Sequence, residues 1–147
     1  MNQFAEKRFL PGNKVSQEDR ERLKKIIAER LSQVSDIVFA YTHGSFVTSE
    51  SFRDIDVGIF VVGEKDFHFE SDISYELSAA TGYEVEVRII NNAPVGFQTA
   101  VVRDGEVLFS RDEVVRTDFI EDAGRRYKEY AHFRNIFMEA FASDKQG

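Results

Sequence analysis

Segments with the pattern of buried strands alternate with segments of helical periodicity along the 147-residue chain, and this alternation limits the possible folds strongly. Residues 37–41 and 54–62 are apolar runs rich in β-branched and aromatic side chains, which predicts two strands. Residues 83–90 alternate strictly between polar and apolar side chains, which predicts a third strand. Apolar residues recur at helical spacing over 17–33, 67–80 and 113–142. We therefore expect an α/β (α+β) domain in which helices pack against one sheet.

Capping and turn residues indicate where several of these elements begin and end. Ser16 and Asp19 resemble a capping box at the start of the first helix, and Gly82 is placed to end the second in a left-handed cap. Pro94 can open a short helix over 94–103. A turn containing glycine then leads to a fourth predicted strand over 106–109.

The chain has the length and composition of one domain. It shows no internal repeat, low-complexity tract or linker, so we expect a single domain over residues 1–147 with a core of about 16–142. There is no Cys, and the first ten residues lack the apolar run of a signal peptide. The longest unbroken apolar stretches, such as 59–62, are too short to span a bilayer. We expect a cytoplasmic protein without a membrane segment.

The acidic residues gather in the middle of the chain. The net charge is −7, which argues against broad attraction to nucleic acid. Residues 35–110 contain 13 Asp and Glu but only 4 Lys and Arg. Such residues commonly form a solvated surface, but carboxylates that converge in a cleft repel one another unless a cation is bound. We therefore consider a binding site for a divalent metal ion in this region.

Gly44-Ser45 directly follows the first predicted strand. A glycine at this point allows a tight turn, in which successive amide groups can point into one concavity and bind phosphate. If a helical turn starts at Phe46, its amide groups and the Ser45 hydroxyl add further donors for a triphosphate. The alternative is an ordinary loop, which a Gly-Ser dipeptide by itself does not exclude.

Asp54 and Asp56 lie two residues apart at the start of the next predicted strand. Side chains at this spacing project from the same face of a strand, so the two carboxylates can share one ion. Mg²⁺ suits such a pair because it binds one or two protein carboxylates and completes its octahedron with phosphate oxygens and water. The alternative is a strand end whose aspartates only meet solvent.

The spacing of these motifs resembles a known signature. His43-Gly44-Ser45, then eight residues, then Asp54-Ile55-Asp56-Val57 is similar to the motif of the DNA polymerase beta superfamily, and within it to the minimal nucleotidyltransferase family. The runs over 86–94 and 103–109 resemble that family's strand, Asn-Ala-Pro segment and hairpin. The resemblance covers about residues 16–142 and implies a polymerase-beta-like nucleotidyltransferase fold with one mixed sheet.

The resemblance also implies a site and a reaction. Gly44 and Ser45 would bind the nucleotide, and Asp54, Asp56 and Glu86 would be catalytic and would bind two Mg²⁺ ions. ATP or another nucleoside triphosphate would donate its nucleoside monophosphate to an acceptor hydroxyl. The family commonly has ten residues between Ser and the first Asp, and an Asp as third carboxylate. Here the gap is eight, and Glu86 reaches one methylene further.

Two further residues beside this site have open roles. Arg88 lies on the same strand face as Glu86, where it could neutralise phosphate or pair with Glu84 or Glu86. His43 could approach the triphosphate or be a bystander, and we do not include it in the catalytic set.

Proteins that this chain resembles are often encoded beside an all-helical HEPN toxin, which they neutralise by contact or by adenylylating a Tyr. The resemblance therefore implies an adenylyltransferase-type enzyme that acts as the antitoxin of a HEPN-type partner. The alternative is a module that binds nucleotide and inhibits its partner without catalysis. A small-molecule nucleotidyltransferase is a third possibility, although no second substrate-binding domain is visible.

The last predicted helix carries an aromatic stripe. Tyr127, Tyr130, Phe137 and Phe141 recur at three- and four-residue spacing after Ile120 and Ala123, with Phe133 nearby. We expect this stripe to pack on the core of the domain, and a homodimer or partner interface is the alternative.

Overall fold

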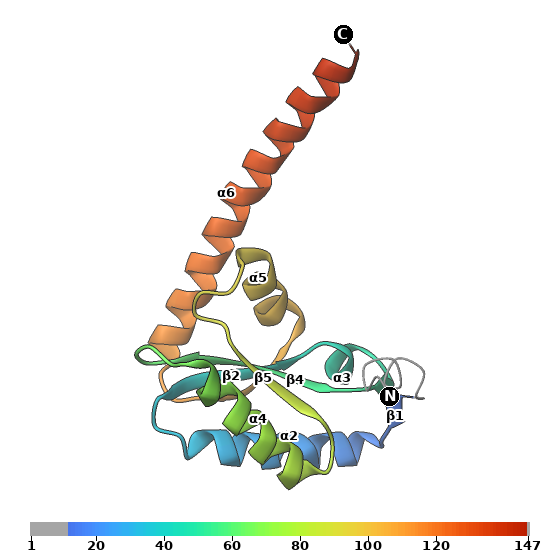
Figure 1. Ribbon diagram of the computed structural model, residues 1–147, viewed down its shortest axis with the longest axis vertical. Coiled ribbons are helices and arrows are strands. Elements are labelled where there is room, and N and C mark those ends of the chain that lie inside the picture. Colours follow the sequence, from blue (N-terminus) through green and yellow to red (C-terminus); the bar gives the residue numbers. More distant parts are fainter. Residues whose placement is uncertain (1–11, 147) are drawn as a thin grey trace.

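The computed structural model describes residues 12–146, with side chains described up to residue 142. Its helices and strands alternate along the chain, which ends in the long helix α6 (Figure 1). In chain order the elements are β1 (Asn13–Lys14), α2 (Gln17–Ser32), β2 (Ile37–His43), α3 (Ser45–Thr48), β3 (Ser51–Phe52), β4 (Ile55–Val61), α4 (Phe67–Thr81), β5 (Val85–Ile89), α5 (Val95–Asp104), β6 (Glu106–Ser110) and α6 (Glu113–Gln146).

The sequence predicted most boundaries of these elements correctly. The Ser16 hydroxyl accepts a hydrogen bond from the Asp19 amide at 3.1 Å, which caps α2 as expected. Gly82 ends α4 with a φ of 80°, in the left-handed region that favours glycine. The sequence did not predict the antiparallel pair of β1 and β3, because each of these strands is only two residues long and carries no periodic pattern.

Four strands form the main sheet in the order β5-β4-β2-β6. β4 and β5 are parallel, whereas β2 is antiparallel to both β4 and β6. The expected mixed sheet is thus confirmed. The parallel pair requires a crossover connection, which α4 provides between β4 and β5.

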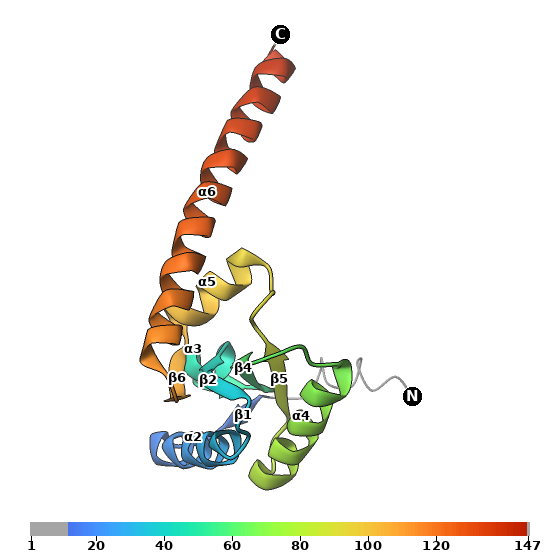
Figure 2. The same cartoon turned by 90° about the vertical axis from the view of Figure 1, so that its left-hand side faces the viewer.

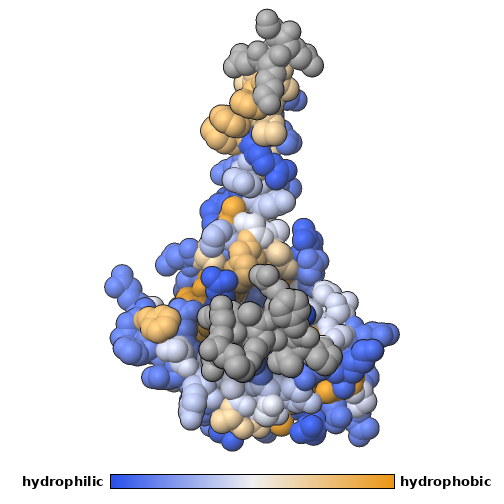
Figure 3. Space-filling model, turned by 45° about the vertical axis from the view of Figure 1, so that its right-hand side comes forward, coloured by the Kyte–Doolittle hydropathy of each residue, from blue (hydrophilic) through white to orange (hydrophobic). Residues whose placement is uncertain are grey.

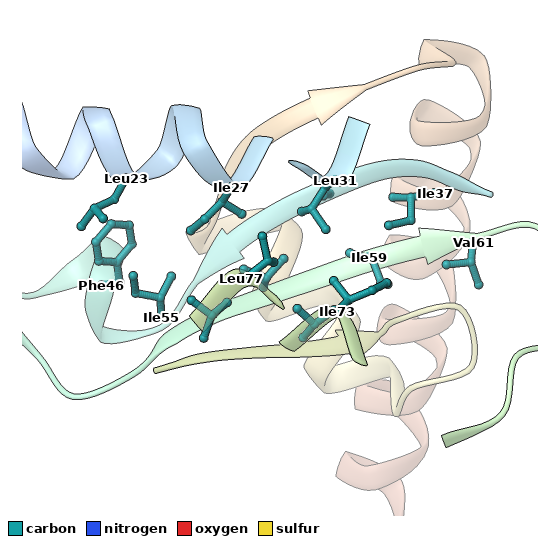
Figure 4. Packing of buried hydrophobic residues seen from close by; sticks show 14 of the residues in the cluster. Leu23, Ile27, Leu31, Ile37, Phe46, Ile55, Ile59, Val61, Ile73 and Leu77 are labelled. Carbon is teal, nitrogen blue, oxygen red and sulfur yellow. The ribbon is translucent and has the colours of Figure 1, made fainter. Parts of the chain in front are cut away.

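Helices cover both faces of this sheet (Figure 2). α2 and α4 lie on one face, and α5 with the first part of α6 lies on the other. Between the sheet and the first helix pair, buried aliphatic side chains interdigitate (Figure 4). Those labelled from α2, α4 and β4 include Leu23, Ile27, Leu31, Ile73, Leu77, Ile55 and Ile59. Each such side chain contributes about 1.5–3 kcal/mol when it is removed from water, so this layer holds the strand ends in place.

A second, more aromatic cluster fills the opposite face. Phe39 lies parallel to Phe60 with ring centroids 5.0 Å apart, and Phe119 of α6 packs against both rings. Val101 of α5 and Ala123 of α6 are also buried. These contacts anchor the first three turns of α6 to the domain.

The rest of α6 projects away from the domain as an uninterrupted helix (Figure 1). Tyr130, Phe133, Phe137 and Phe141 are between 49% and 70% exposed. Our expectation that this stripe packs on the core of the domain is therefore wrong beyond Ala123. The reason is geometric, because α6 rises steeply away from the sheet and, at about 50 Å for 34 residues, carries its outer turns beyond the domain (Figure 1).

No helix within the described part of the chain is long and apolar enough to cross a membrane.

Candidate functional site

A glycine turn joins β2 to the short helix α3 at one end of the sheet. Gly44 has a φ of 75° and a ψ of −157°, a conformation that is essentially restricted to glycine. Its Cα faces the neighbouring strand so closely that an added Cβ would lie 2.5 Å from Oδ2 of Asp56. The helical turn considered to start at Phe46 is present as α3 and begins one residue earlier, at Ser45. The sequence motif thus requires glycine for two reasons, its backbone angle and its contact with a carboxylate.

The carboxylates of the motif come from β4 and the adjacent strand β5. Asp56 is the register partner of His43 on one side and of Glu86 on the other. Asp54 lies two residues before Asp56, just outside β4. Because strand residues two apart share a face, both aspartates belong to the face that α5 covers further along. Among the glutamates of the alternating segment, Glu86 is the one directly beside Asp56.

The electrostatics of Asp56 reflect this crowding. Burial, followed by the nearby charges of Glu86 and Asp54, raises the pKa of the Asp56 carboxyl from 3.8 to about 6. The positive charge of Arg88 opposes this effect but does not cancel it. A carboxyl group surrounded by like charges is relieved when a cation or phosphate-bound metal enters.

An open cavity of about 360 Å³ lies beside the glycine turn. Ser45, Arg53, Asp54 and Asp56 are among its lining residues. It therefore combines a hydroxyl, a guanidinium and two carboxylates on one side of the turn. Glu86 is not among the residues that line it, since it lies on the next strand.

A buried arginine holds the chain that follows the turn. Arg20 of α2 is 8% exposed, and its guanidinium donates hydrogen bonds to the carbonyl oxygens of Phe46, Ser49 (2.8 Å) and Glu50 (2.6 Å). The same group lies 5.3 Å from the ring centroids of both Phe46 and Phe52. It fixes the path of residues 46–50 and thereby the position of the turn.

The sequence analysis missed Arg20, although a signal was present. Arg20 occupies the first position of the stripe Leu23, Ile27 and Leu31, which are all buried. A charged residue at a buried helical position needs hydrogen-bond partners. Carbonyl oxygens of a non-regular segment are suitable partners for a guanidinium, which has five donors.

His43 is not among the residues that line the cavity beside the glycine turn, but together with Gly44 and Phe97 it lines a second cavity of about 280 Å³. Its ring meets Phe97 edge to face, with centroids 5.4 Å apart, and among the described residues its buried Nε2 has no hydrogen-bond partner. Burial, aided by the charge of Arg88, lowers the pKa of His43 and thus favours the neutral form of the ring. This favours the interpretation of His43 as a bystander.

Arg88 packs on an aromatic ring close to the carboxylates. Its guanidinium carbon lies 5.1 Å from the centroid of Phe97, which comes from α5. From there its positive charge opposes the rise in the pKa of Asp56 without cancelling it. The side chain is thus held by α5 beside the acidic group.

The donor set at this end of the sheet suits a hard divalent cation. Asp54, Asp56 and Glu86 offer only carboxylate oxygens, the ligands that Mg²⁺ prefers. The raised pKa of Asp56 reflects its burial first and the repulsion from the other two carboxylates second. Within the part of the chain that the structure describes, no three His, Asp or Glu side chains already surround one point as metal ligands. A metal that used all three carboxylates would require at least one of these side chains to change its rotamer.

Comparison with solved structures shows the same fold. One chain of the complex of the tri-AMPylated Shewanella oneidensis HEPN toxin with the MNT antitoxin is 16% identical, with a TM-score of 0.69. The match covers 82% of this chain and 97% of that one. A chain of the toxin-antitoxin complex MntA-HepT is 15% identical over 85% of this chain and 97% of that one, with a TM-score of 0.63.

A chain of a toxin-antitoxin structure with AMP-PNP is 16% identical over 86% of this chain and 98% of that one, with a TM-score of 0.64. No curated protein matches the chain. The family model of polymerase beta nucleotidyltransferases matches residues 24–114, which include the glycine turn and all three carboxylates. The chain belongs to the polymerase beta nucleotidyltransferase family.

Proposed function

We propose that this protein is a Mg²⁺-dependent nucleotidyltransferase that transfers AMP from ATP to a hydroxyl group of a partner protein. The partner that we propose is a HEPN-type toxin, which this protein neutralises as its antitoxin. The observation that carries the proposal is the position of Asp56, which adjoins Asp54 and Glu86 and faces the Gly44 turn. Similar proteins in solved structures are described with an AMPylated HEPN toxin and with AMP-PNP, which supports both substrate classes.

Each side chain of the site has a distinct role in this proposal. Asp54 and Asp56 would hold the metal that accompanies the triphosphate, and Glu86 would complete a second metal position on the acceptor side. When bound, Mg²⁺ would act as a Lewis acid that lowers the pKa of the acceptor hydroxyl and neutralises charge on the phosphates. Ser45 orients the donor, because it borders the same cavity as the aspartates, and Gly44 gives the turn the backbone conformation that places Ser45 there.

The transfer is balanced in atoms and charge. The acceptor oxygen attacks the α-phosphorus and forms a new P–O bond, while the bond from that phosphorus to the β-phosphate oxygen breaks. Pyrophosphate leaves, and the proton of the hydroxyl passes to solvent. Arg53 lines the cavity and contributes a positive charge beside the phosphates. Because ATP and a toxin acting inside the cell are both intracellular, we propose that the protein works in the cytoplasm.

A non-catalytic module is the second candidate. It is favoured by the finding that no three of the described acidic or histidine side chains already surround a metal position. Glu86 in place of the usual Asp and the short spacing before Asp54 favour it as well. Such a module would bind Mg²⁺-ATP at the two aspartates and inhibit its partner by contact alone.

Incubation with ATP labelled at the α-phosphate, Mg²⁺ and the protein encoded by the neighbouring gene separates these candidates. Transfer of label to the partner that requires Mg²⁺ and disappears in Asp56→Asn supports the enzyme. Inhibition at equal stoichiometry without label transfer supports the module. If neither transfer nor Mg²⁺-ATP binding is measurable by calorimetry, both candidates fail.

A further inference from the structure

A short ribbon of two strands, β1 and β3, forms one wall of the cavity beside the glycine turn. The strands are antiparallel, with Asn13 opposite Phe52 and Lys14 opposite Ser51. β1 and α3 lie at the same end of the main sheet (Figure 1). The residues that line the cavity from this ribbon and its flanks are Gly12, Ser51, Phe52 and Arg53. The ribbon therefore bounds the cavity together with Ser45 and the two aspartates.

The core of the domain holds this ribbon in place. Phe52 is 1% exposed, and its ring packs edge to face against that of Phe46, with centroids 4.9 Å apart. Arg20 lies over both rings and binds the carbonyl oxygens of residues 49 and 50, just before β3. Because Phe46 belongs to α3, the ribbon and the glycine turn have one common support. Their polar side chains are thus positioned relative to each other before a ligand arrives, which reduces the cost of binding.

The backbone of Gly12 passes very close to the side chain of Ser51. A Cβ added at Gly12 would overlap with Oγ of Ser51 and lie 3.2 Å from its Cβ. A larger residue at position 12 would therefore force the Ser51 hydroxyl into another rotamer. Since both residues line the cavity, Gly12 leaves room for this hydroxyl at the cavity wall.

The polar groups of the cavity suit a metal ion and an anion together. Asp54 and Asp56 offer carboxylate oxygens for a divalent cation. Ser45 and Ser51 offer hydroxyl donors, and Arg53 offers a guanidinium, which are suitable ligands for phosphate oxygens. In the view that brings this end of the molecule forward, the described surface of the domain is mostly hydrophilic, and apolar residues gather mainly on and near α6 (Figure 3). A phosphorylated ligand that carries a metal ion matches this combination.

The order of the strands indicates which phosphates the cavity would hold. Asp56 has Glu86 as its register partner on one side and His43, which precedes the glycine turn, on the other. In a nucleotidyl transfer, the attacking and leaving oxygens are roughly in line on opposite sides of the phosphorus. If the acceptor approaches beside Glu86, the leaving pyrophosphate lies on the side of the glycine turn and the ribbon.

We propose that the β1–β3 ribbon forms a pyrophosphate subsite, in which the Ser51 hydroxyl and the Arg53 guanidinium bind the β- and γ-phosphates of the nucleoside triphosphate. Gly12 is a positioning residue, which acts by leaving room for the Ser51 hydroxyl. The inference rests on the proposed function, since it assumes that a nucleotide binds in this cavity. It predicts that the protein binds pyrophosphate itself, without the nucleoside.

The test measures the dissociation constants of Mg²⁺-ATP and Mg²⁺-pyrophosphate by calorimetric titration of the full-length protein. Arg53→Gln should raise both constants by about 10- to 100-fold, because a hydrogen-bonding positive charge is lost. The two factors should be equal within about threefold, since the ribbon contacts only phosphates that both ligands contain. Lys14→Gln is the matched control, because Lys14 is exposed on the same ribbon but does not line the cavity. It should change both constants by less than about threefold.

A double-mutant cycle tests the role of Gly12. Ser51→Ala and Gly12→Ala should each raise both dissociation constants by about five- to tenfold. The double variant should bind as Ser51→Ala does, because the hydroxyl that Gly12 accommodates is already absent and a small shift relieves the remaining 3.2 Å contact. Ser49→Ala is the control, since Ser49 is exposed just before the ribbon and does not line the cavity. Additive losses in the double variant would show that Gly12 does not act through Ser51.

Urea denaturation shows whether each variant keeps its fold, and the exposed pair Arg53 and Lys14 tests the subsite even if Gly12→Ala unfolds. A wild type that binds Mg²⁺-ATP but not Mg²⁺-pyrophosphate overturns the inference. So does an Arg53→Gln variant that loses affinity for Mg²⁺-ATP alone or for neither ligand. In these cases the wild type still binds Mg²⁺-ATP, so the proposed function stands. A wild type that does not bind Mg²⁺-ATP refutes the proposed function itself.

Discussion

Replacing Arg20 by Met should destabilise the protein and weaken nucleotide binding together. Met keeps an unbranched apolar stem of similar length but leaves the carbonyl oxygens of Phe46, Ser49 and Glu50 without the guanidinium. Each hydrogen bond to a charged group contributes about 1.5–3 kcal/mol. The sum over the three hydrogen bonds is an upper limit on the lost stability. The variant no longer has to desolvate a buried charge, and the partly exposed carbonyl oxygens can bind water instead.

We therefore expect the free energy of unfolding to fall by about 2–4 kcal/mol, which lowers Tm by roughly 5–15 °C for a domain of this size. The segment that Arg20 holds begins one residue after Ser45, so the turn should also lose its fixed position. Affinity for Mg²⁺-ATP should drop by about tenfold or more, equivalent to about 1.4 kcal/mol of lost preorganisation.

Urea denaturation monitored by circular dichroism and calorimetric titration of Mg²⁺-ATP measure the two effects. Arg22→Met is the matched control, since Arg22 lies on the same helix with a side chain that is 61% exposed. It should change the free energy of unfolding by less than about 0.5 kcal/mol. If Arg20→Met loses less than about 1 kcal/mol, or loses stability while binding Mg²⁺-ATP normally, then Arg20 does not position the turn.

Three other changes test the site. Gly44→Ala should lower the free energy of unfolding by about 1–3 kcal/mol and abolish Mg²⁺-ATP binding. Gly63→Ala is the control, because Gly63 has a similar φ of 78° and nothing lies within 4 Å of its added Cβ. It should lose stability from backbone strain in a denaturation experiment but bind Mg²⁺-ATP normally. Because the folded-state pKa of Asp56 is raised from 3.8 to about 6, the metal-free protein should lose stability as pH rises from about 4 to 7. Asp56→Asn should remove this pH-dependent loss and raise the free energy of unfolding by about 1 kcal/mol above pH 6, after allowance for solvent screening. If the pH profile of unfolding is the same in the variant as in the wild type, the raised pKa of Asp56 is wrong. Glu86→Ala should keep most of its Mg²⁺-ATP affinity, but its rate of label transfer should fall by several orders of magnitude. Glu84→Ala should transfer label normally. If Glu84→Ala is the inactive variant instead, the third carboxylate is assigned to the wrong glutamate.

Local sequence patterns were sufficient for most of the secondary structure, and they predicted the residues of the candidate site. The Gly44 turn, the capping of α2 and the alternating segment of β5 each depend on contacts within a few residues, which a linear pattern can report. The mixed sheet and the family followed from the resemblance carried by the glycine turn and the carboxylate motif, and the family model matches residues 24–114, which include both.

Long-range contacts decided the rest. Which glutamate adjoins Asp56 depends on the register of two parallel strands, and a shift by two residues would replace Glu86 by Glu84 without altering the pattern of either strand. The role of Arg20 depends on carbonyl oxygens 26 to 30 residues away, which no local pattern shows.

The fate of the aromatic stripe on α6 was decided in the same way. Its periodicity states only that one side of the helix is apolar, and a core, a homodimer and a partner would all satisfy it. The sequence by itself thus determined that Phe133 and Phe137 share a side of a helix. Only the tertiary structure showed that both side chains stay exposed, because α6 points away from the sheet and carries them beyond the domain (Figure 1).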